Sequence, residues 1–301
     1  MQLREALTSG EFVVTAELGP PLDPDPEPVR RTARALAGIV DAANVTDNQA
    51  ATVKLSPLPC AAWMLEEGLT PILQLTTRDR NVLALQSDLL GAWALGVRAV
   101  LALSGDPLKV GPYDGISHAV SDFDSLGLLG LLGLLNEGRL LAGEELKTPT
   151  DFLALAAANP LVDSVEKLEQ KVAAGARCLQ TNIVYDVDRF IEWYAPVLAS
   201  GLPDRAPVLV GVSPPRSVGA LEYMNRNIPG IEVDQVSFDA MAGLAGEEAR
   251  IAGIEIATAV ITRLREVEGV SGVHLMAPGW EDEAIPALVS AARIGPTSRG
   301  G

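Results

Sequence analysis

The sequence is poor in the residues that build metal centres. Its 301 residues include two cysteines, Cys60 and Cys178, and two histidines, His118 and His274, and each of the four stands alone in the sequence. Zinc sites and iron–sulfur clusters need several such ligands at short spacings. We therefore expect no metal site built by this chain alone, and we expect both cysteines to pack as small apolar side chains.

Basic residues and long apolar runs are also scarce. The sequence has 23 lysines and arginines against 39 acidic residues. The resulting formal net charge of −16 repels nucleic acid and anionic lipid. The apolar stretch Leu126–Leu135 is broken by glycines and falls short of the roughly 20 residues that span a bilayer. No signal-peptide pattern opens the sequence. We expect no nucleic-acid or membrane binding and a cytoplasmic location.

The Gly-rich phosphate-binding motifs are absent as well. No G-x-G-x-x-G follows a predicted strand, and no G-x-x-x-x-G-K-[ST] occurs. What the sequence does have is a regular alternation of short aliphatic runs with longer amphipathic segments, which is typical of parallel strands joined by helices. The predicted strands are Phe12–Leu18, Asp41–Val45, Pro71–Leu75, Ala99–Leu103, Phe152–Ala157, Cys178–Asn182, Val208–Val212 and Gly272–Met276.

Eight strand-then-helix repeats in 301 residues favour a closed (β/α)8 TIM barrel over an open sheet. We predict an α/β fold with a single domain over residues 1–301. Two segments depart from the repeat: a long connection over 107–121, of a length usual in lids and binding loops, and an extra helical excursion over 231–248 before the last strand. Residues 295–301 are predicted to be a flexible tail. Predicted helices include Asn81–Leu95, Ser164–Ala174, Asp188–Ser200 and Glu247–Glu266.

One glutamate stands in an unfavourable place for a carboxylate. Glu17 lies near the end of the first apolar strand, which Gly19-Pro20-Pro21 closes. Burial disfavours the charged form of a carboxyl group, so a buried Glu17 could act as an acid. The alternative is a structural ion pair with a lysine or arginine.

Active sites of (β/α)8 barrels lie at the C-terminal ends of the strands, so the residues that leave each strand carry the information. They are rich in carboxylates and carboxamides, which suit a heterocycle with ring N–H and C=O groups. Asp106 is our candidate for binding the polar edge of such a heterocycle. The alternative is a turn or capping role for Asp106 in Ser104–Pro107. The strand-end segments are Thr46–Gln49, Thr76–Arg80, Ser104–Pro107, Asn159–Pro160, Thr181–Asn182 and Ser213–Pro214.

Each lysine or arginine near the C-terminal ends of the strands has two possible roles. Lys167 and Lys171 lie four residues apart on one helical face, where surface ion pairing is the default expectation. Arg78 and Arg80 could hold a phosphate or could pair with Asp79, and the spacing leaves both open.

In their order along the chain, several motifs resemble the methylenetetrahydrofolate reductase family, most closely its short bacterial form with the catalytic barrel alone. The resemblance covers roughly residues 3 to 293 and agrees with the barrel expected from the strand pattern. The motifs are Thr15–Pro21, Val45–Gln49, Gln74–Asn81, Leu85–Gly91, Leu103–Asp106, Lys171–Ala176, Tyr185–Asp186 and His274–Glu281.

The resemblance implies a flavin enzyme that reduces 5,10-methylenetetrahydrofolate to 5-methyltetrahydrofolate, with NADH as the usual electron donor. It implies that Glu17 is the general acid that helps to open the imidazolidine ring. It assigns Asp106, Gln180 and Asn182 to the folate substrate. The flavin would be surrounded by Thr46, Gln74, Thr76, Ser104, Asn159 and Lys171.

The chain departs from the family pattern at four positions. Gln74 replaces a histidine beside the flavin, Ser104 an arginine, and Asn182 a folate-contacting glutamine, while Val218 stands where some members have a stacking aromatic residue. Loss of the arginine removes a phosphate partner, so FMN becomes an alternative to FAD. An accessory folate-binding subunit with weakened flavin binding is the alternative function. Further expectations are an iron–sulfur subunit as electron donor and homo-oligomer formation, for which Leu126–Leu135 could supply a contact.

Overall fold

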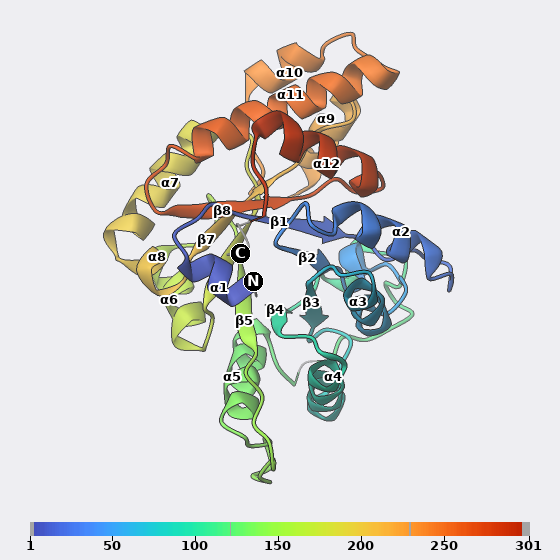
Figure 1. Ribbon diagram of the computed structural model, residues 1–301, viewed down its shortest axis with the longest axis vertical. Coiled ribbons are helices and arrows are strands. Elements are labelled where there is room, and N and C mark those ends of the chain that lie inside the picture. The colour runs from blue at the N-terminus through green and yellow to red at the C-terminus, as the bar shows by residue number, and fades with distance from the viewer. Residues whose placement is uncertain (1–2, 121, 229, 297–301) are drawn as a thin grey trace.

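A computed structural model of the chain describes residues 3–120, 122–228 and 230–296. Its centre is a closed barrel of parallel strands in the order β1 to β8, with β8 paired to β1 (Figure 1). The predicted (β/α)8 barrel is confirmed, and the largest shift of a predicted strand start is at β8, which begins at 270 rather than 272. The strands are β1 Val13–Leu18, β2 Ala42–Val45, β3 Pro71–Thr76, β4 Ala99–Leu103, β5 Leu153–Ala158, β6 Cys178–Ile183, β7 Val208–Val212 and β8 Val270–Leu275.

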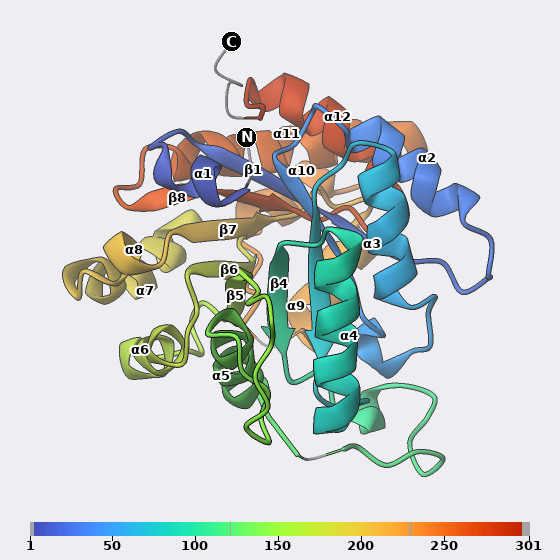
Figure 2. The ribbon, with the colours of Figure 1, turned by 60° about the horizontal axis from the view of Figure 1, so that its bottom comes forward.

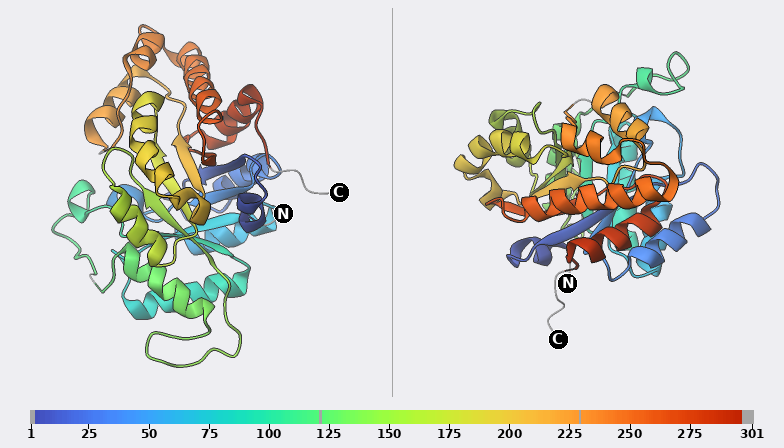
Figure 3. Two further views of the ribbon diagram at one scale, coloured as in Figure 1. Left: turned by 90° about the vertical axis from the view of Figure 1, so that its left-hand side faces the viewer. Right: turned by 90° about the horizontal axis from the view of Figure 1, so that it is seen from above.

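Helices surround the barrel, with α3 and α4 side by side on one flank and α11 beside α12 on another (Figures 2 and 3). Side-chain caps fix several starts: Asn81, Asp124 and Ser164 each accept a hydrogen bond from a backbone N–H of the first turn of α4, α5 and α6. The helices are α1 Leu3–Thr8, α2 Glu27–Leu36, α3 Pro57–Glu66, α4 Val82–Leu95, α5 Ser125–Asn136, α6 Val165–Ala173, α7 Val187–Ala199, α8 Leu202–Arg205, α9 Val218–Asn227, α10 Gln235–Met241, α11 Gly246–Leu264 and α12 Glu281–Ala292.

The strands separate two apolar cores. Alternate residues such as Val14 and Ala16 of β1 face outward and pack with the helices in the larger core. Val13, on the other face, joins a smaller core inside the barrel, where Leu3 and Leu7 of α1 close the N-terminal end. Because both faces are covered, all six residues of β1 are buried. The barrel interior therefore has an apolar floor and opens at the C-terminal ends of its strands.

Both predicted departures from the repeat are present. The excursion before β8 is wider than 231–248, because α9 as well as α10 lies between β7 and α11. The connection after β4 contains a short 3-10 helix, η2 (Leu108–Val110), which packs against another, η1 (Gln49–Ala51). Of the predicted flexible tail, residues 297–301 lie outside the described residues, as does position 121 of the long connection.

The leucine-rich segment and the cysteines belong to the protein interior. Most leucines of α5 are buried against the barrel, which leaves few of them for the partner contact predicted through Leu126–Leu135, and that contact stays a prediction. Cys60 and Cys178 are free thiols and both are buried, as predicted, and burial raises the pKa of the Cys60 thiol to about 12. Over the described ranges, every helix is too short or too polar to cross a bilayer.

Candidate active site

A cavity of about 720 Å³ opens at the C-terminal ends of the strands. One wall, from β4 and β5, is apolar and includes Leu101, Leu103 and Ala157, whereas the opposite wall and the layer of side chains directly above the apolar floor are polar. Thr46, predicted to lie beside the flavin, is buried and is not part of this lining. The cavity brings together nine of the ten predicted site residues: Glu17, Gln74, Thr76, Ser104, Asp106, Asn159, Lys171, Gln180 and Asn182.

Glu17 lies on the cavity floor with 8% of its surface exposed. Its Oε2 accepts a hydrogen bond from Gln74 Nε2 at 3.3 Å and lies 3.9 Å from His274 Nε2. Among the described residues no lysine or arginine pairs with it, so the predicted alternative of a structural ion pair with such a cation does not hold. The carboxyl group is set between an amide and an imidazole, at the edge of the space that a ligand would fill.

Below Glu17, a belt of polar side chains crosses the barrel interior. Thr15 Oγ1 lies 3.0 Å from His274 Nδ1, and Gln180 Nε2 donates to the same hydroxyl at 3.4 Å. Asn44 Nδ2 donates to Gln180 Oε1 at 2.8 Å. All four side chains are buried. Sequence analysis assigned Gln180 to the site but gave no site role to Thr15, Asn44 or His274. Thr15 and Asn44 each lie two residues before a named strand-end residue, Glu17 and Thr46, and so on the same face of the strand.

A second carboxyl group lies near Glu17. Glu281 begins α12, and its Oε1 lies 3.4 Å from the point that a β-carbon on Gly19 would occupy. Burial raises the pKa of Glu281, and the charge of Glu17 adds to that effect. Glu281 belongs to a motif that supports the family resemblance, but its proximity to Glu17 follows from the closure of the barrel and was not predicted.

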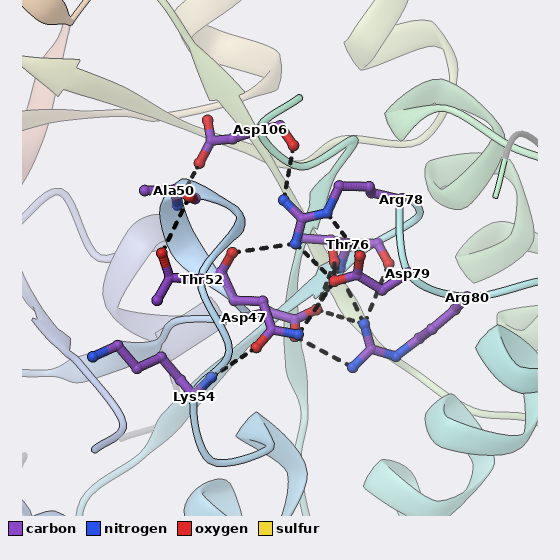
Figure 4. A network of polar contacts seen from close by, with 10 residues as sticks. Asp47, Ala50, Thr52, Lys54, Thr76, Arg78, Asp79, Arg80 and Asp106 are labelled. Atoms are coloured by element: carbon purple, nitrogen blue, oxygen red, sulfur yellow. Dashed lines mark hydrogen bonds and ion pairs between the residues drawn. The ribbon is translucent and has the colours of Figure 1, made fainter. Parts of the chain in front are cut away.

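Asp47 organises the rim at the ends of β2 and β3 (Figure 4). Its Oδ2 accepts hydrogen bonds from Thr76 N at 2.8 Å, Thr76 Oγ1 at 2.9 Å and Arg80 Nη1 at 2.6 Å. Arg80 also pairs with Asp88. Although burial alone would lower it, the pKa of Arg80 is raised by these two carboxylates. Arg80 therefore pairs with carboxylates of its own chain, though not with Asp79 as one interpretation of the sequence held.

Arg78 does pair with Asp79, through two hydrogen bonds of 2.7 Å. That pairing is the first cause of the raised pKa of Arg78. Its Nη1 donates to the backbone oxygen of Asp106 at 2.8 Å, and its Nη2 to that of Asn48 at 3.2 Å (Figure 4). This nearly buried guanidinium thus ties together the loops after β2, β3 and β4. Like Arg80, it is held by groups of its own chain.

The carboxylate of Asp106 holds a turn of unusual conformation. Its Oδ2 accepts a hydrogen bond from Ala50 N at 2.8 Å (Figure 4). Asn48, Ala50 and Ala51 all have positive φ angles, of 45°, 54° and 51°, in a region that residues with a β-carbon rarely adopt. Asp106 therefore stabilises a neighbouring loop, whereas the sequence offered a turn within its own loop as the alternative to ligand binding.

Lys171 is not a surface residue, so the default expectation of solvated pairing is wrong for it. Its Nζ donates to Ala157 O at 2.7 Å and to Asp163 Oδ2 at 2.9 Å, and its side chain is 12% exposed. Lys167, which is more exposed, pairs with the other oxygen of Asp163 at 2.7 Å. Burial opposes ionisation of Asp163, yet the two lysines hold its pKa below the ordinary value.

The departures from the family pattern take structural roles of their own. Ser104 Oγ accepts a hydrogen bond from Ser125 N, at the start of α5, at 3.1 Å. Asn182 Oδ1 accepts one from Ile183 N at 2.8 Å. Val218 is the first residue of α9 and packs with α9–α11 side chains, outside the cavity lining. Of the four, Gln74 contacts the predicted acid, Glu17.

Comparisons with solved structures place the fold among known barrels. An uncharacterized protein from Clostridium thermocellum that binds two copies of 5-methyl-5,6,7,8-tetrahydrofolic acid aligns over 97% of this chain and 98% of its own, with a TM-score of 0.68 and 14% identity. An F420-dependent secondary alcohol dehydrogenase aligns over 94% and 99%, with a TM-score of 0.52 and 12% identity. At such identities these likenesses show the fold alone.

Comparisons with curated sequences show more. Methylenetetrahydrofolate reductase 2 of Saccharomyces cerevisiae is 26% identical over 159 residues, 49% of this chain and 24% of the yeast protein. Methylenetetrahydrofolate reductase 1 of Schizosaccharomyces pombe is 23% identical over 217 residues, 67% of this chain and 32% of that protein. The chain thus spans about a quarter to a third of these relatives. The family model for methylenetetrahydrofolate reductase matches residues 2–292, and the chain belongs to the methylenetetrahydrofolate reductase family.

Proposed function

We propose that the protein reduces 5,10-methylenetetrahydrofolate to 5-methyltetrahydrofolate by hydride transfer from a reduced flavin, with Glu17 as the general acid. The observation that carries this proposal is the position of Glu17. Its carboxyl group lies on the floor of a large cavity, is 8% exposed, and has an amide and an imidazole as neighbours in place of a cation. A carboxyl group at this position is within reach of a ligand in the cavity and can pass a proton to it.

The cavity suits a planar ring system. The apolar wall of β4 and β5 offers a surface for a ring face, and Gln74, Thr76 and Asn159 offer amide and hydroxyl groups for ring edges. Lys171 and Lys167 lie at the rim, where they would face a phosphate. These residues fit a flavin, which when bound would supply the hydride. One lysine pair matches a single phosphate, which favours FMN as much as FAD.

The chain's own residues have distinct tasks in this scheme. Glu17 donates its proton to a ring nitrogen of the folate and so helps the imidazolidine ring to open. Asp106 and Asn182 would hold the pterin edge. Asp106 Oδ2 already accepts from Ala50 N, but a carboxylate has about four acceptor sites, so the residue can bind both partners. The apolar floor beneath the polar belt keeps water away from the reacting atoms on that side.

The test is an anaerobic half-reaction. Protein loaded with FAD or FMN is reduced chemically and mixed with 5,10-methylenetetrahydrofolate, and the return of the oxidised flavin absorbance is followed together with 5-methyltetrahydrofolate. Glu17→Gln should slow this step by about 10²–10⁴-fold, the usual contribution of a general acid, and leave flavin binding intact. Glu255→Gln, the same change on the exposed face of α11, is the matched control. Unchanged folate reduction in Glu17→Gln would show that the acid is misassigned.

A second candidate function is an accessory folate-binding subunit. The observation that favours it is that Arg78, Arg80 and Lys171 are each bound by a carboxylate of the same chain, so a flavin diphosphate would have to compete with Asp79, Asp47 or Asp163. Purified protein that binds folate but retains neither FAD nor FMN would support this candidate over the reductase.

The electron donor is a separate part of the proposal. NADH and an iron–sulfur subunit are the two candidates. Rapid reduction of the bound flavin by NADH alone, under anaerobic conditions, would support the first, and reduction that needs an added iron–sulfur protein would support the second.

A further inference from the structure

We propose that His274 is a positioning residue that shares one proton with Glu17 and thereby keeps the acid loaded. This inference rests on the proposed role of Glu17 and adds a partner to it. His274 lies on β8, where the strand register places it opposite Thr15 of β1, and its ring is 3% exposed. The ring is therefore held between the two inward-facing polar residues of β1, Thr15 and Glu17.

Thr15 is the partner that would select the tautomer of the histidine. The hydroxyl has one proton, and it lies 3.4 Å from the carbonyl oxygen of Val273, to which it can donate. Thr15 Oγ1 also receives an N–H from Gln180 at 3.4 Å. In the arrangement that we propose, the hydroxyl directs this proton to Val273 and accepts at His274, and Nδ1, 3.0 Å away, carries the hydrogen. Nε2 of the neutral ring is then an acceptor, and it faces Glu17.

The distance between Nε2 and Glu17 Oε2 is 3.9 Å. This is longer than a hydrogen bond, but contacts of catalytic groups are commonly long before a ligand binds and shorten in the complex. Gln74 donates to the same oxygen at 3.3 Å, and this hydrogen bond helps to hold the carboxyl group beside the ring. Glu17 Oε2 therefore has Gln74 as a hydrogen-bond donor and His274 Nε2 as a further polar neighbour.

Few other charges face this pair. On β8 and its neighbours the facing groups are Thr15 and Glu17 from β1 and the glycine Gly211 from β7. Across the barrel lie the neutral amides of Asn44, Gln74 and Gln180. In the apolar floor lies Cys178, whose pKa burial raises. Beyond Glu17 lies Glu281, whose pKa burial raises.

In this setting Glu17 and His274 together hold one proton, either as carboxylic acid and imidazole or as carboxylate and imidazolium. Both forms have a net charge of zero, which a buried site favours over an isolated carboxylate. In the reaction this proton leaves the pair and bonds to the folate nitrogen. The pair is left as carboxylate and neutral imidazole, with a charge of −1, and takes up one proton from solvent before the next turnover.

Nuclear magnetic resonance can read the tautomer directly, because the chain has two histidines and His118 is exposed on the connection after β4. Protein labelled with ¹⁵N in histidine gives two sets of ring signals, and His118→Gln assigns them. We expect His274 as the Nδ1–H tautomer or as a doubly protonated ring, at a pH at which folate is reduced. A neutral Nε2–H ring would overturn the proposal.

The pH profile of the folate half-reaction gives the second test. In wild type the shared proton can reside on Glu17 or on His274. The rate of folate reduction should therefore persist to higher pH in wild type than in His274→Gln, in which Glu17 alone holds the proton. Thr15→Val should also move the alkaline limb of the pH–rate profile to lower pH. Thr15→Ser, which keeps the hydroxyl, should have the wild-type profile. His118→Gln is the matched control.

The two tests separate this inference from the proposed function. If the wild-type protein does not reduce folate at all, the proposed function fails, whatever the histidine spectrum shows. If wild type reduces folate and His274→Gln loses rate equally at every pH, the role of His274 is merely structural and the inference is wrong.

Discussion

The turn at Asn48–Ala51 makes a counterintuitive prediction: replacing Ala50 by glycine should stabilise the protein. Ala50 has φ 54° and ψ 31°, in the left-handed region. A β-carbon there costs roughly 1–2 kcal/mol, and glycine removes that cost. Ala50 is exposed, so its methyl group loses little packing when it is deleted.

The gain is reduced by the unfolded state. Glycine there has more conformational freedom than alanine, which costs roughly 0.4–1 kcal/mol on folding. The net effect of Ala50→Gly is thus a gain of about 0.5–1 kcal/mol in the free energy of unfolding. The backbone N–H that donates to Asp106 is unchanged by the substitution, so that hydrogen bond remains.

Urea unfolding at pH 7, followed by circular dichroism, measures the difference. The matched control is Ala259→Gly, the same change at an exposed position in the middle of α11, where glycine should cost about 1 kcal/mol. The two variants should therefore move the midpoint in opposite directions. If Ala50→Gly destabilises the protein as much as Ala259→Gly does, the turn is not strained and the reasoning is refuted.

Two further predictions follow from pKa shifts. Asp163→Asn should lower the free energy of unfolding at pH 7 by about 1–3 kcal/mol, because Lys171 loses its charged partner. Since the pKa of Asp163 is lowered on folding, this deficit should disappear as pH falls below the ordinary value of 3.8, which urea titrations in acid would show. Glu281→Gln should have the opposite pH dependence. The pKa of Glu281 is raised above 4.5 on folding, so wild type loses stability as pH rises through the folded value, and the variant should gain on wild type in melting temperature between pH 4 and pH 8.

The fold was predictable because the strands of a closed parallel barrel are buried on both faces. The run Val13–Leu18 is continuous in burial, so it is recognisable as a strand without any periodic pattern. Because both faces of each strand are buried, the sequence pattern does not show which face of the strand points into the barrel. Within β1, Thr15 and Glu17 mark the interior face, and only the register with β8 shows that His274 lies beside them.

Ion pairs in the site were beyond prediction for a different reason. The partners of Arg80 and Lys171 are Asp47 and Asp163, and the choice among nearby carboxylates depends on how separate loops meet. Asp47 lies 33 positions from Arg80. Strand-end position correctly placed Asp106 in the cavity lining, but its hydrogen bond to the loop after β2 depends on the left-handed turn, for which the sequence has no glycine signal.

The apolar floor has a consequence for the order of events in a turnover. Because α1 and the interior core close the barrel at its N-terminal end, the mouth is the route by which solvent protons reach Glu17 and His274. A ligand seated in the mouth covers that route. In the proposed scheme, Glu17 and His274 must then take up their proton before the folate binds. One proton is available to each bound folate, and the pair is protonated again only after the product leaves.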